Sequence, residues 1–210
     1  MAAILAGGLV GCGGGLGADV LAATQITLFG HPDATFSRET VNNIPYASIA
    51  VKIGKGPRSL LILWRSEREE MHWLSADGAA LVTRHGRVVR TAGLPATIRD
   101  TVSSREDPLV TGLHQLGETG SWDRELDLDP EGPVLLYSTF RVIGPRSIEI
   151  SEINFDTILV EEHVETRGLN WSFTNRYWVD PADGFVWRSR QTIARNFPAV
   201  DIEVLKPPAL

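Results

Sequence analysis

The chain has only one cysteine, Cys12, among its 210 residues. One cysteine excludes an intrachain disulfide and a zinc site of the usual spacing. The histidines form no H-E-x-x-H pattern, and the sequence holds neither a G-x-S-x-G elbow nor a Ser-His-Asp order. We therefore expect no metal, no cofactor and no enzyme activity. A pair of catalytic carboxylates that are distant in the sequence but close in the fold would not be detected by these patterns.

Lysine is also scarce, since it occurs only at Lys52, Lys55 and Lys206, and arginine supplies nearly all of the positive charge. The formal net charge is −6. Proteins that bind the phosphate backbone need a concentrated basic surface, so this balance excludes nucleic acid as a partner.

The composition is otherwise that of a globular β protein. Hydrophobic residues make up 43% and charged residues 22%, which are ordinary values for a soluble core and surface. Twenty glycines and twelve prolines favour a fold with many turns. A chain of 210 residues suits one domain.

The stretch Ala47–Pro95 shows the pattern of an antiparallel meander. Ala47–Ile53 alternates apolar and polar residues, as a half-buried strand does. Leu60–Trp64 is a continuous apolar run, which predicts a central strand covered on both faces. Asp77-Gly78 and His85-Gly86 have the composition of tight hairpin turns.

The meander continues towards the C-terminus. Val134–Ile143 reads as a strand, and Gly144-Pro145-Arg146 reads as a turn into the long run Ser147–Glu165. Within that run the apolar parity changes, which predicts a bulge or break near Ser151-Glu152. Trp171–Asp180 and Phe185–Ile193 form a hairpin, and three other segments complete the expected strands: Thr24–Phe29, Trp122–Leu128 and Asp201–Lys206.

Two short helices are expected beside the strands. Ser37 is placed to cap a helix over residues 37–42, and Asp107-Pro108 can open another within the polar insertion Asp100–Gln115. That insertion is expected to be either a lid or partner-facing loop, or an exposed connector. The predicted fold is mainly β: a single-domain antiparallel meander that forms a strongly curved sheet or incomplete β-barrel, with one or two short helices.

The N-terminus has the pattern of an export signal. Leu9-Val10-Gly11-Cys12 has the pattern of a lipobox, in which the cysteine thiol receives diacylglycerol, although an incidental cysteine in a buried segment is the alternative. We predict a lipoprotein signal peptide over residues 1–11, a flexible tether over 12–23 and the β domain over 24–210. No lysine or arginine precedes the apolar run, so we expect the signal to be truncated. Gly13, where an aspartate would retain the protein at the inner membrane, favours the periplasmic face of the outer membrane.

Three segments carry a family resemblance: Trp73–Pro95, Phe173–Gln191 and the closing Val204–Pro208. They resemble the YjbF/GfcB-type lipoproteins of bacterial capsule and exopolysaccharide operons. The resemblance implies a lipoprotein attached to the outer membrane, with an antiparallel β fold and a role in polysaccharide export. It implies no catalytic residues.

Candidate binding residues cluster at Asn175, Arg176, Tyr177 and Trp178. Aromatic rings beside Arg or Asn can stack on sugar rings and bond hydroxyls, so this group is a candidate site for a glycan or an export partner. The alternative is that the aromatic rings fill the core, since Tyr177 and Trp178 point to opposite faces of a strand.

A weaker candidate is the acidic run that contains Glu161, His163 and Glu165, which share one face of a strand. They offer either a weak metal site or, more simply, a solvated strand edge.

Three functions follow from these patterns. The first is a non-enzymatic, lipid-anchored periplasmic protein that assists exopolysaccharide or capsule secretion by binding glycan or an export partner. The second is a carrier of lipid or another apolar ligand in a curved half-barrel. The third is a polysaccharide-modifying enzyme that uses carboxylates such as Glu161 or Glu165.

Overall fold

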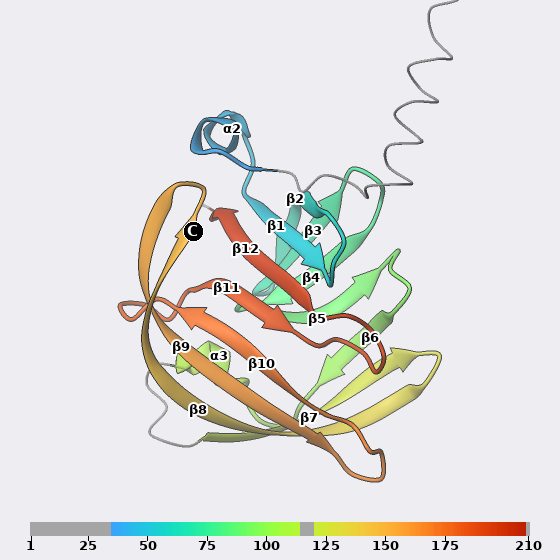
Figure 1. The fold of residues 1–210 in the computed structure, drawn as a ribbon. Coiled ribbons are helices and arrows are strands. Elements are labelled where there is room, and N and C mark those ends of the chain that lie inside the picture. The colour runs from blue at the N-terminus through green and yellow to red at the C-terminus, as the bar shows by residue number, and fades with distance from the viewer. Residues whose placement is uncertain (1–34, 114–119, 209–210) are drawn as a thin grey trace, which may run out of the picture. The chain divides into compact units, whose positions relative to one another are not determined.

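The computed structural model describes residues 35–113 and 120–208, which form one antiparallel sheet of twelve strands with two short helices (Figure 1). The mainly β meander expected from the sequence is confirmed. The strands are β1 (Ser48–Ile53), β2 (Arg58–Glu67), β3 (Glu70–Ser75), β4 (Ala80–Arg84), β5 (Arg87–Ala92), β6 (Thr97–Val102), β7 (Gly120–Asp129), β8 (Gly132–Ile150), β9 (Ile153–Thr166), β10 (Ser172–Val179), β11 (Val186–Gln191) and β12 (Val200–Lys206).

The sheet curls into a nearly closed barrel with one seam. Its strand order is β5-β4-β3-β2-β1-β12-β11-β10-β9-β8-β7-β6, so β5 and β6 are the two ends. These strands share no backbone ladder. Threonine side chains join them instead: Thr91 Oγ1 donates to the Ala96 carbonyl at 3.1 Å and accepts from Ile98 N at 2.9 Å, and Thr101 Oγ1 donates to the Val89 carbonyl at 3.0 Å.

Tight turns join most of the strands, as the sequence predicts. His85 and Gly86 both have positive φ, at 47° and 85°, which is the backbone of a type I′ hairpin. Gly78, at φ 88°, lies in the turn between β3 and β4. Ser151 and Glu152, at φ 48° and 66°, make the predicted break in the long run, which is a hairpin turn between β8 and β9.

Two expectations about strands are wrong. Gly144-Pro145-Arg146 does not turn the chain, because β8 continues through it with a register shift between Val142 and Gly144. The pairing of β8 with β7 ends at Phe140, so Pro145 lies on an edge where its missing N–H removes no ladder bond.

The second wrong expectation concerns the apolar run in β2. Leu61 is buried inside the barrel, but Trp64 is 68% exposed on the opposite side. A barrel covers one face of each strand, so a continuous apolar run here does not mean that both faces are buried.

Both short helices begin at the predicted caps. Helix α2 (Arg38–Asn43) follows Ser37, whose hydroxyl accepts from Thr40 N at 3.2 Å. Helix α3 (Pro108–Thr111) follows Asp107, whose carboxylate accepts from Leu109 N at 3.0 Å. Because Leu109 and Leu113 are buried, α3 and Leu113 pack into the barrel rather than forming an exposed connector.

Two apolar clusters fill the barrel interior and a third lies outside it. The first draws on β1 to β9 and β12, the second on α3 and β7 to β11, and the third lies under α2. Their principal members are Ile49, Leu61, Trp73, Ile98, Leu136, Val164 and Ile202 in the first, Leu109, Trp122, Phe140, Val160 and Val186 in the second, and Val41, Ala50, Ile148, Ile150 and Leu205 in the third.

The predictions for the N-terminus concern residues 1–34, outside the described ranges. They include the signal peptide, Cys12, the tether and the strand Thr24–Phe29. Within residues 35–113 and 120–208 no helix is long and apolar enough to cross a membrane.

Candidate functional site

Two hollows lie at the same end of the barrel, where β12 ends and β5 begins. The larger is a cavity of about 610 Å³. Its walls come from the ends of β3, β4, β11 and β12 and from the turns before β3, β5 and β11. The principal lining residues are Ile49, Met71, Trp73, Phe185, Val186, Trp187, Ile202, Val204, Pro207 and Pro208.

The cavity wall is largely apolar because its aromatic N–H groups are already satisfied. Trp73 Nε1 donates to Thr83 Oγ1 at 2.8 Å, and Trp187 Nε1 donates to Asp180 Oδ2 at 3.0 Å. Trp187 also packs against Phe185, with ring centroids 4.7 Å apart. The indole rings therefore present apolar surface to the cavity.

Polar atoms lie on one side of the cavity. His85 and Glu69 line it there, with His85 Nε2 3.5 Å from Glu69 Oε2. The buried His85 Nε2 has no hydrogen-bond partner within the described residues. This polar side borders the second hollow.

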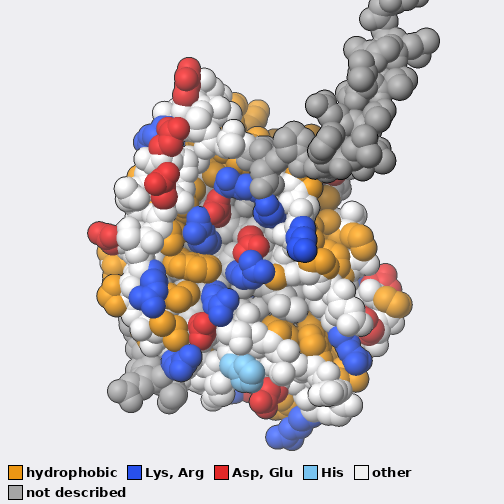
Figure 2. Space-filling model, in the orientation of Figure 1, with side chains coloured by type: hydrophobic (Ala, Val, Ile, Leu, Met, Phe, Trp, Pro, Cys, Tyr) orange, Lys and Arg blue, Asp and Glu red, His pale blue; other side chains and the backbone are white. Residues whose placement is uncertain are grey.

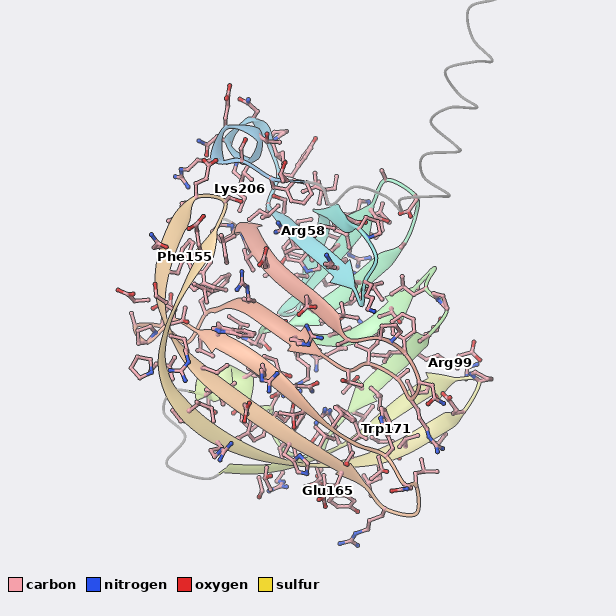
Figure 3. The ribbon with its side chains drawn as sticks, viewed as in Figure 1. Arg58, Arg99, Phe155, Glu165, Trp171 and Lys206 are labelled. Atoms are coloured by element: carbon pink, nitrogen blue, oxygen red, sulfur yellow. The ribbon has the colours of Figure 1, made fainter. Side chains whose placement is uncertain are left out.

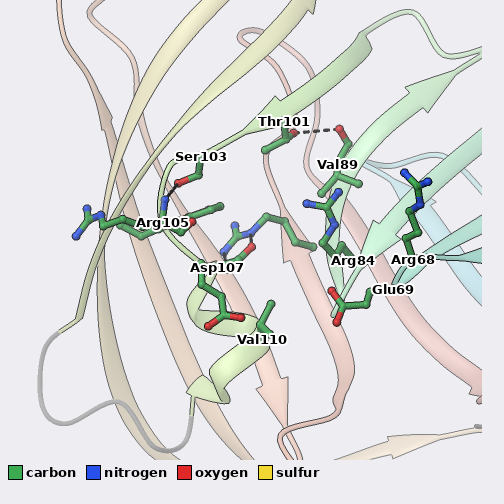
Figure 4. A pocket seen from close by; sticks show the side chains of 12 residues that line it. Arg68, Glu69, Arg84, Val89, Thr101, Ser103, Arg105, Asp107 and Val110 are labelled. Carbon is green, nitrogen blue, oxygen red and sulfur yellow. Dashed lines mark hydrogen bonds and ion pairs between the residues drawn. The ribbon is translucent and has the colours of Figure 1, made fainter.

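The second hollow is a cleft of about 230 Å³ beside the seam (Figure 4). It is lined by the β2–β3 turn, the ends of β4 and β6, the segment before α3, and β5. The lining residues are Arg68, Glu69, Arg84, Arg87, Val89, Thr101, Ser103, Arg105, Glu106, Asp107, Val110 and Trp122.

Ion pairs hold two of the exposed guanidinium groups of this cleft. Arg84 pairs with Glu70, and Arg105 pairs with Asp123. The Arg105 backbone N–H also donates to Ser103 Oγ at 3.1 Å (Figure 4). An arginine has five N–H donors, so one ion pair leaves others for a ligand.

A buried network of charges forms the floor of the cleft. Glu162 is fully buried, and its carboxylate accepts hydrogen bonds from Arg87, Arg124, Ser138, Asn175 and Tyr177 at 2.7–3.0 Å. Arg87 also pairs with Asp107, its Nη2 lying 3.1 Å from Oδ1. The two guanidinium groups balance the two carboxylates, which a buried cluster requires.

Burial and charge oppose each other in this network. Burial alone would raise the pKa of Glu162, but the charges of Arg124 and Arg87 outweigh it and hold that pKa far below the ordinary value. Burial raises the pKa of Tyr177 well above its usual range and lowers that of Arg124. Glu162 therefore stays ionised and cannot act as a general acid near neutral pH.

The predicted binding group divides between the two faces of β10. Asn175 and Tyr177 point inward and bond Glu162. Arg176 points outward and bonds Glu161 at 3.0 Å, while Trp178 lies on the same outer face with the Arg188 guanidinium 5.8 Å from its ring. The four residues do not share one surface, and glycan binding by the outward pair stays a prediction.

The acidic run lies on the outer face of β9. Glu161 binds Arg141 and Arg176, and His163 Nε2 lies 3.4 Å from Glu165 Oε1. Residues 35–113 and 120–208 contain no cluster of three ligands that could hold a metal ion. β9 pairs with both β8 and β10, so these charges decorate a sheet face rather than a strand edge.

Charged residues also gather on the outer face of β1, β2, β11 and β12 (Figure 2). Arg58 and Arg188 both pair with Glu203, and Arg190 bonds Asp201 at 3.0 Å. These ion pairs connect side chains of β2, β11 and β12, so we assign them to sheet stability.

The buried network is the part of the site that sequence reasoning missed. A signal existed, since Glu162 shares its parity with the apolar Val160 and Val164 and so points inward on β9. The acidic residues next to Glu162 suggest an exposed segment and obscure this signal. Its partner Arg87 also lies 75 positions away in the chain.

Comparison with known proteins identifies the family to which this chain is similar. Residues 21–205 match the family described as "Group 4 capsule polysaccharide lipoprotein gfcB, YjbF". In Escherichia coli (strain K12), "Uncharacterized lipoprotein GfcB" is 29% identical over 186 residues, which cover 87% of this chain and 86% of that protein. "Uncharacterized lipoprotein YjbF" of the same organism is 27% identical over 184 residues, covering 86% and 84%.

A solved structure agrees with this match. The crystal structure of the hypothetical lipoprotein YmcC from Escherichia coli (K12) superposes with a TM-score of 0.76 at 26% identity, covering 91% of this chain and 96% of that one. The resemblance in three segments of the sequence thus extends along most of the chain. The protein belongs to the YjbF family of group 4 capsule polysaccharide lipoproteins.

Proposed function

We propose that this protein assists capsule or exopolysaccharide secretion without catalysing a reaction, held by acylated Cys12 on the periplasmic face of the outer membrane. Its molecular task is to bind the apolar part of a ligand in the cavity. Family membership supports the envelope location and the link to polysaccharide. The observation that carries the binding role is the cavity of about 610 Å³ with walls of Trp73, Phe185 and Trp187.

The size and lining of the cavity suit an alkyl chain. Small-molecule sites are mostly apolar and occupy about 300–1,000 Å³. Each methylene group moved from water into such a site contributes about 0.8 kcal/mol. A glycan alone could stack its ring faces on these aromatic side chains, but the largely apolar wall would leave most of its hydroxyl groups without hydrogen-bond partners.

Occlusion of the cavity tests this role. The full chain carrying Cys12→Ser, which removes the competing acyl group, is titrated with a fluorescent fatty acid. Val204 lines the cavity from β12, so Val204→Trp fills part of it and should weaken probe binding about tenfold or more. The control is Leu74→Trp, because Leu74 lies outside the cavity and is 37% exposed on β3.

Equal binding by both variants, or no binding by the parent chain, would exclude the cavity as a lipid site. Native mass spectrometry of protein purified from envelopes gives an independent readout. We expect a co-purified apolar molecule that Val204→Trp removes.

A further inference from the structure

We infer that the cavity and the cleft form one site for an amphiphile, with its alkyl chain in the cavity and an uncharged saccharide head in the cleft. This inference rests on the proposed function and adds the chemistry of the head group. Its evidence is the shared wall of the two hollows and the side chains that line the cleft.

The two hollows share a wall. Glu69, from the β2–β3 turn, and Val110, from α3, line both of them. Figure 4 shows these two residues among the cleft lining, with Arg68 and Arg84 on the same side as Glu69. A ligand whose chain enters the cavity therefore places its head beside the cleft.

The cleft is rich in both donors and acceptors. Guanidinium groups come from Arg68, Arg84, Arg105 and, at the floor, Arg87, and carboxylates come from Glu69, Glu106 and Asp107. Sugar hydroxyls both donate and accept hydrogen bonds, so they match such a mixture. An anionic head would meet the carboxylates as well as the arginines, which disfavours it.

The buried charge network under the cleft fixes its side chains before a ligand binds. Arg87 is held by Asp107 and Glu162, and its guanidinium lies 4.7 Å from the ring centre of Trp122. Groups fixed before binding lose little conformational entropy when the ligand arrives. Trp122 is buried between Arg87 and Arg124, so it supports the arginines and does not stack on the sugar.

Two amphiphiles with the same alkyl chain distinguish the contribution of the head group to binding from the contribution of the chain. Dodecyl maltoside has a saccharide head rich in hydroxyl groups, and dodecyl phosphocholine has a zwitterionic head without hydroxyl groups on an identical alkyl chain. Both are titrated calorimetrically, below their micelle thresholds, into the full chain carrying Cys12→Ser. We expect the maltoside to bind about tenfold more tightly, the effect of one or two additional hydrogen bonds to charged groups.

A matched pair of variants locates the head. Arg105 lines the cleft, is 54% exposed and pairs with Asp123. Arg99 lies on β6, is 53% exposed and pairs with Asp129, outside the cleft (Figure 3). Arg105→Ala should weaken maltoside binding about tenfold and change phosphocholine binding by less than about twofold, whereas Arg99→Ala should change neither.

The outcomes separate the two proposals. Equal affinity for both amphiphiles, unchanged by Arg105→Ala but abolished by Val204→Trp, would overturn the saccharide head and leave the apolar site standing. Tighter binding of phosphocholine would also overturn it. If neither amphiphile binds, both proposals fail.

Discussion

Gly86 in the β4–β5 turn lies directly against Val186 of β11, and a Cβ added at position 86 would be 2.6 Å from the Val186 Cβ. Gln191 of the same strand reinforces this contact, because its amide donates to the Gly86 carbonyl at 2.8 Å and accepts from Val88 N at 3.0 Å. The start of the end strand β5 is thereby fastened to β11 from inside the barrel.

Gly86→Ala should destabilise the protein through both strain and crowding. The positive φ costs about 1–2 kcal/mol for a residue with a Cβ, and overpacking against Val186 adds about 1–3 kcal/mol. Gly78→Ala is the control, because Gly78 has a similar φ of 88° but nothing within 4 Å of its added Cβ. Urea unfolding should show a clearly larger loss for Gly86→Ala; equal losses would contradict the Val186 contact.

Glu162→Gln should cost about 3–5 kcal/mol in the free energy of unfolding, because it leaves Arg87 and Arg124 buried without their shared counter-charge. Glu161→Gln is the adjacent control and should cost at most about 1 kcal/mol, since its arginine partners are exposed. Chemical denaturation of the two variants at pH 7 makes the comparison. Similar costs would mean that the buried network contributes little.

The same carboxylate should make stability depend on pH. The pKa of Glu162 is lowered by Arg124 and Arg87 despite burial, so its stabilisation is complete above the unfolded value of 4.5 and is lost as pH falls towards the folded pKa. Between pH 5.5 and 3.5 the unfolded chain takes up a proton that the folded chain does not. The free energy of unfolding should therefore fall by about 1 kcal/mol more in the wild type than in Glu162→Gln. Parallel curves would refute the assignment.

Thr91→Val should loosen the seam. The change removes both bonds of Thr91 Oγ1 and leaves the buried Ile98 N–H and Ala96 carbonyl without this partner, at a cost of about 1–3 kcal/mol. Hydrogen exchange at the Ile98 amide should accelerate. The control is Thr139→Val, at an exposed position of β8, with an expected effect within about 0.5 kcal/mol. Unchanged exchange at Ile98 would show that the seam is held by other contacts.

Glu69→Gly should stabilise the fold while weakening amphiphile binding. Glu69 adopts φ 69° in the β2–β3 turn, which glycine adopts without the cost of about 1 kcal/mol. Glu152→Gly is the control, since Glu152 has φ 66° in the β8–β9 turn and lines neither hollow. Both variants should melt higher, but only Glu69→Gly should lose affinity for dodecyl maltoside. If Glu69→Gly binds dodecyl maltoside with unaltered affinity, Glu69 is not part of the binding site.

The local features of this fold were predictable because local backbone chemistry determines them. The His85-Gly86 turn, the Ser37 and Asp107 caps and the break at Ser151-Glu152 follow from positive φ, side-chain acceptors and strand parity. The turn expected at Gly144-Pro145-Arg146 is wrong because a strand tolerates a proline where no neighbouring strand pairs with that edge. The sequence does not show where the pairing between β7 and β8 ends.

The site was largely beyond prediction, because long-range contacts create it. Glu162 meets Arg87, Arg124 and Tyr177 only after four separate strands close the barrel. The cavity joins residues as distant as Ile49 and Pro208, and its many apolar residues are of types that are ordinary for a core. Composition cannot distinguish an apolar residue that fills a core from one that lines a hollow.

The pairing of Ser48 with Lys206 has a practical consequence for protein engineering. It brings the entrance of β1 beside the exit of β12, where Lys206 Nζ also donates to the Ile44 carbonyl at 2.6 Å (Figure 3). Pro207 and Pro208, which follow, line the cavity. A fluorescent protein inserted directly after Pro208 would therefore lie next to the cavity lining and crowd it, whereas one inserted at the exposed Asp77-Gly78 turn would lie away from the lining.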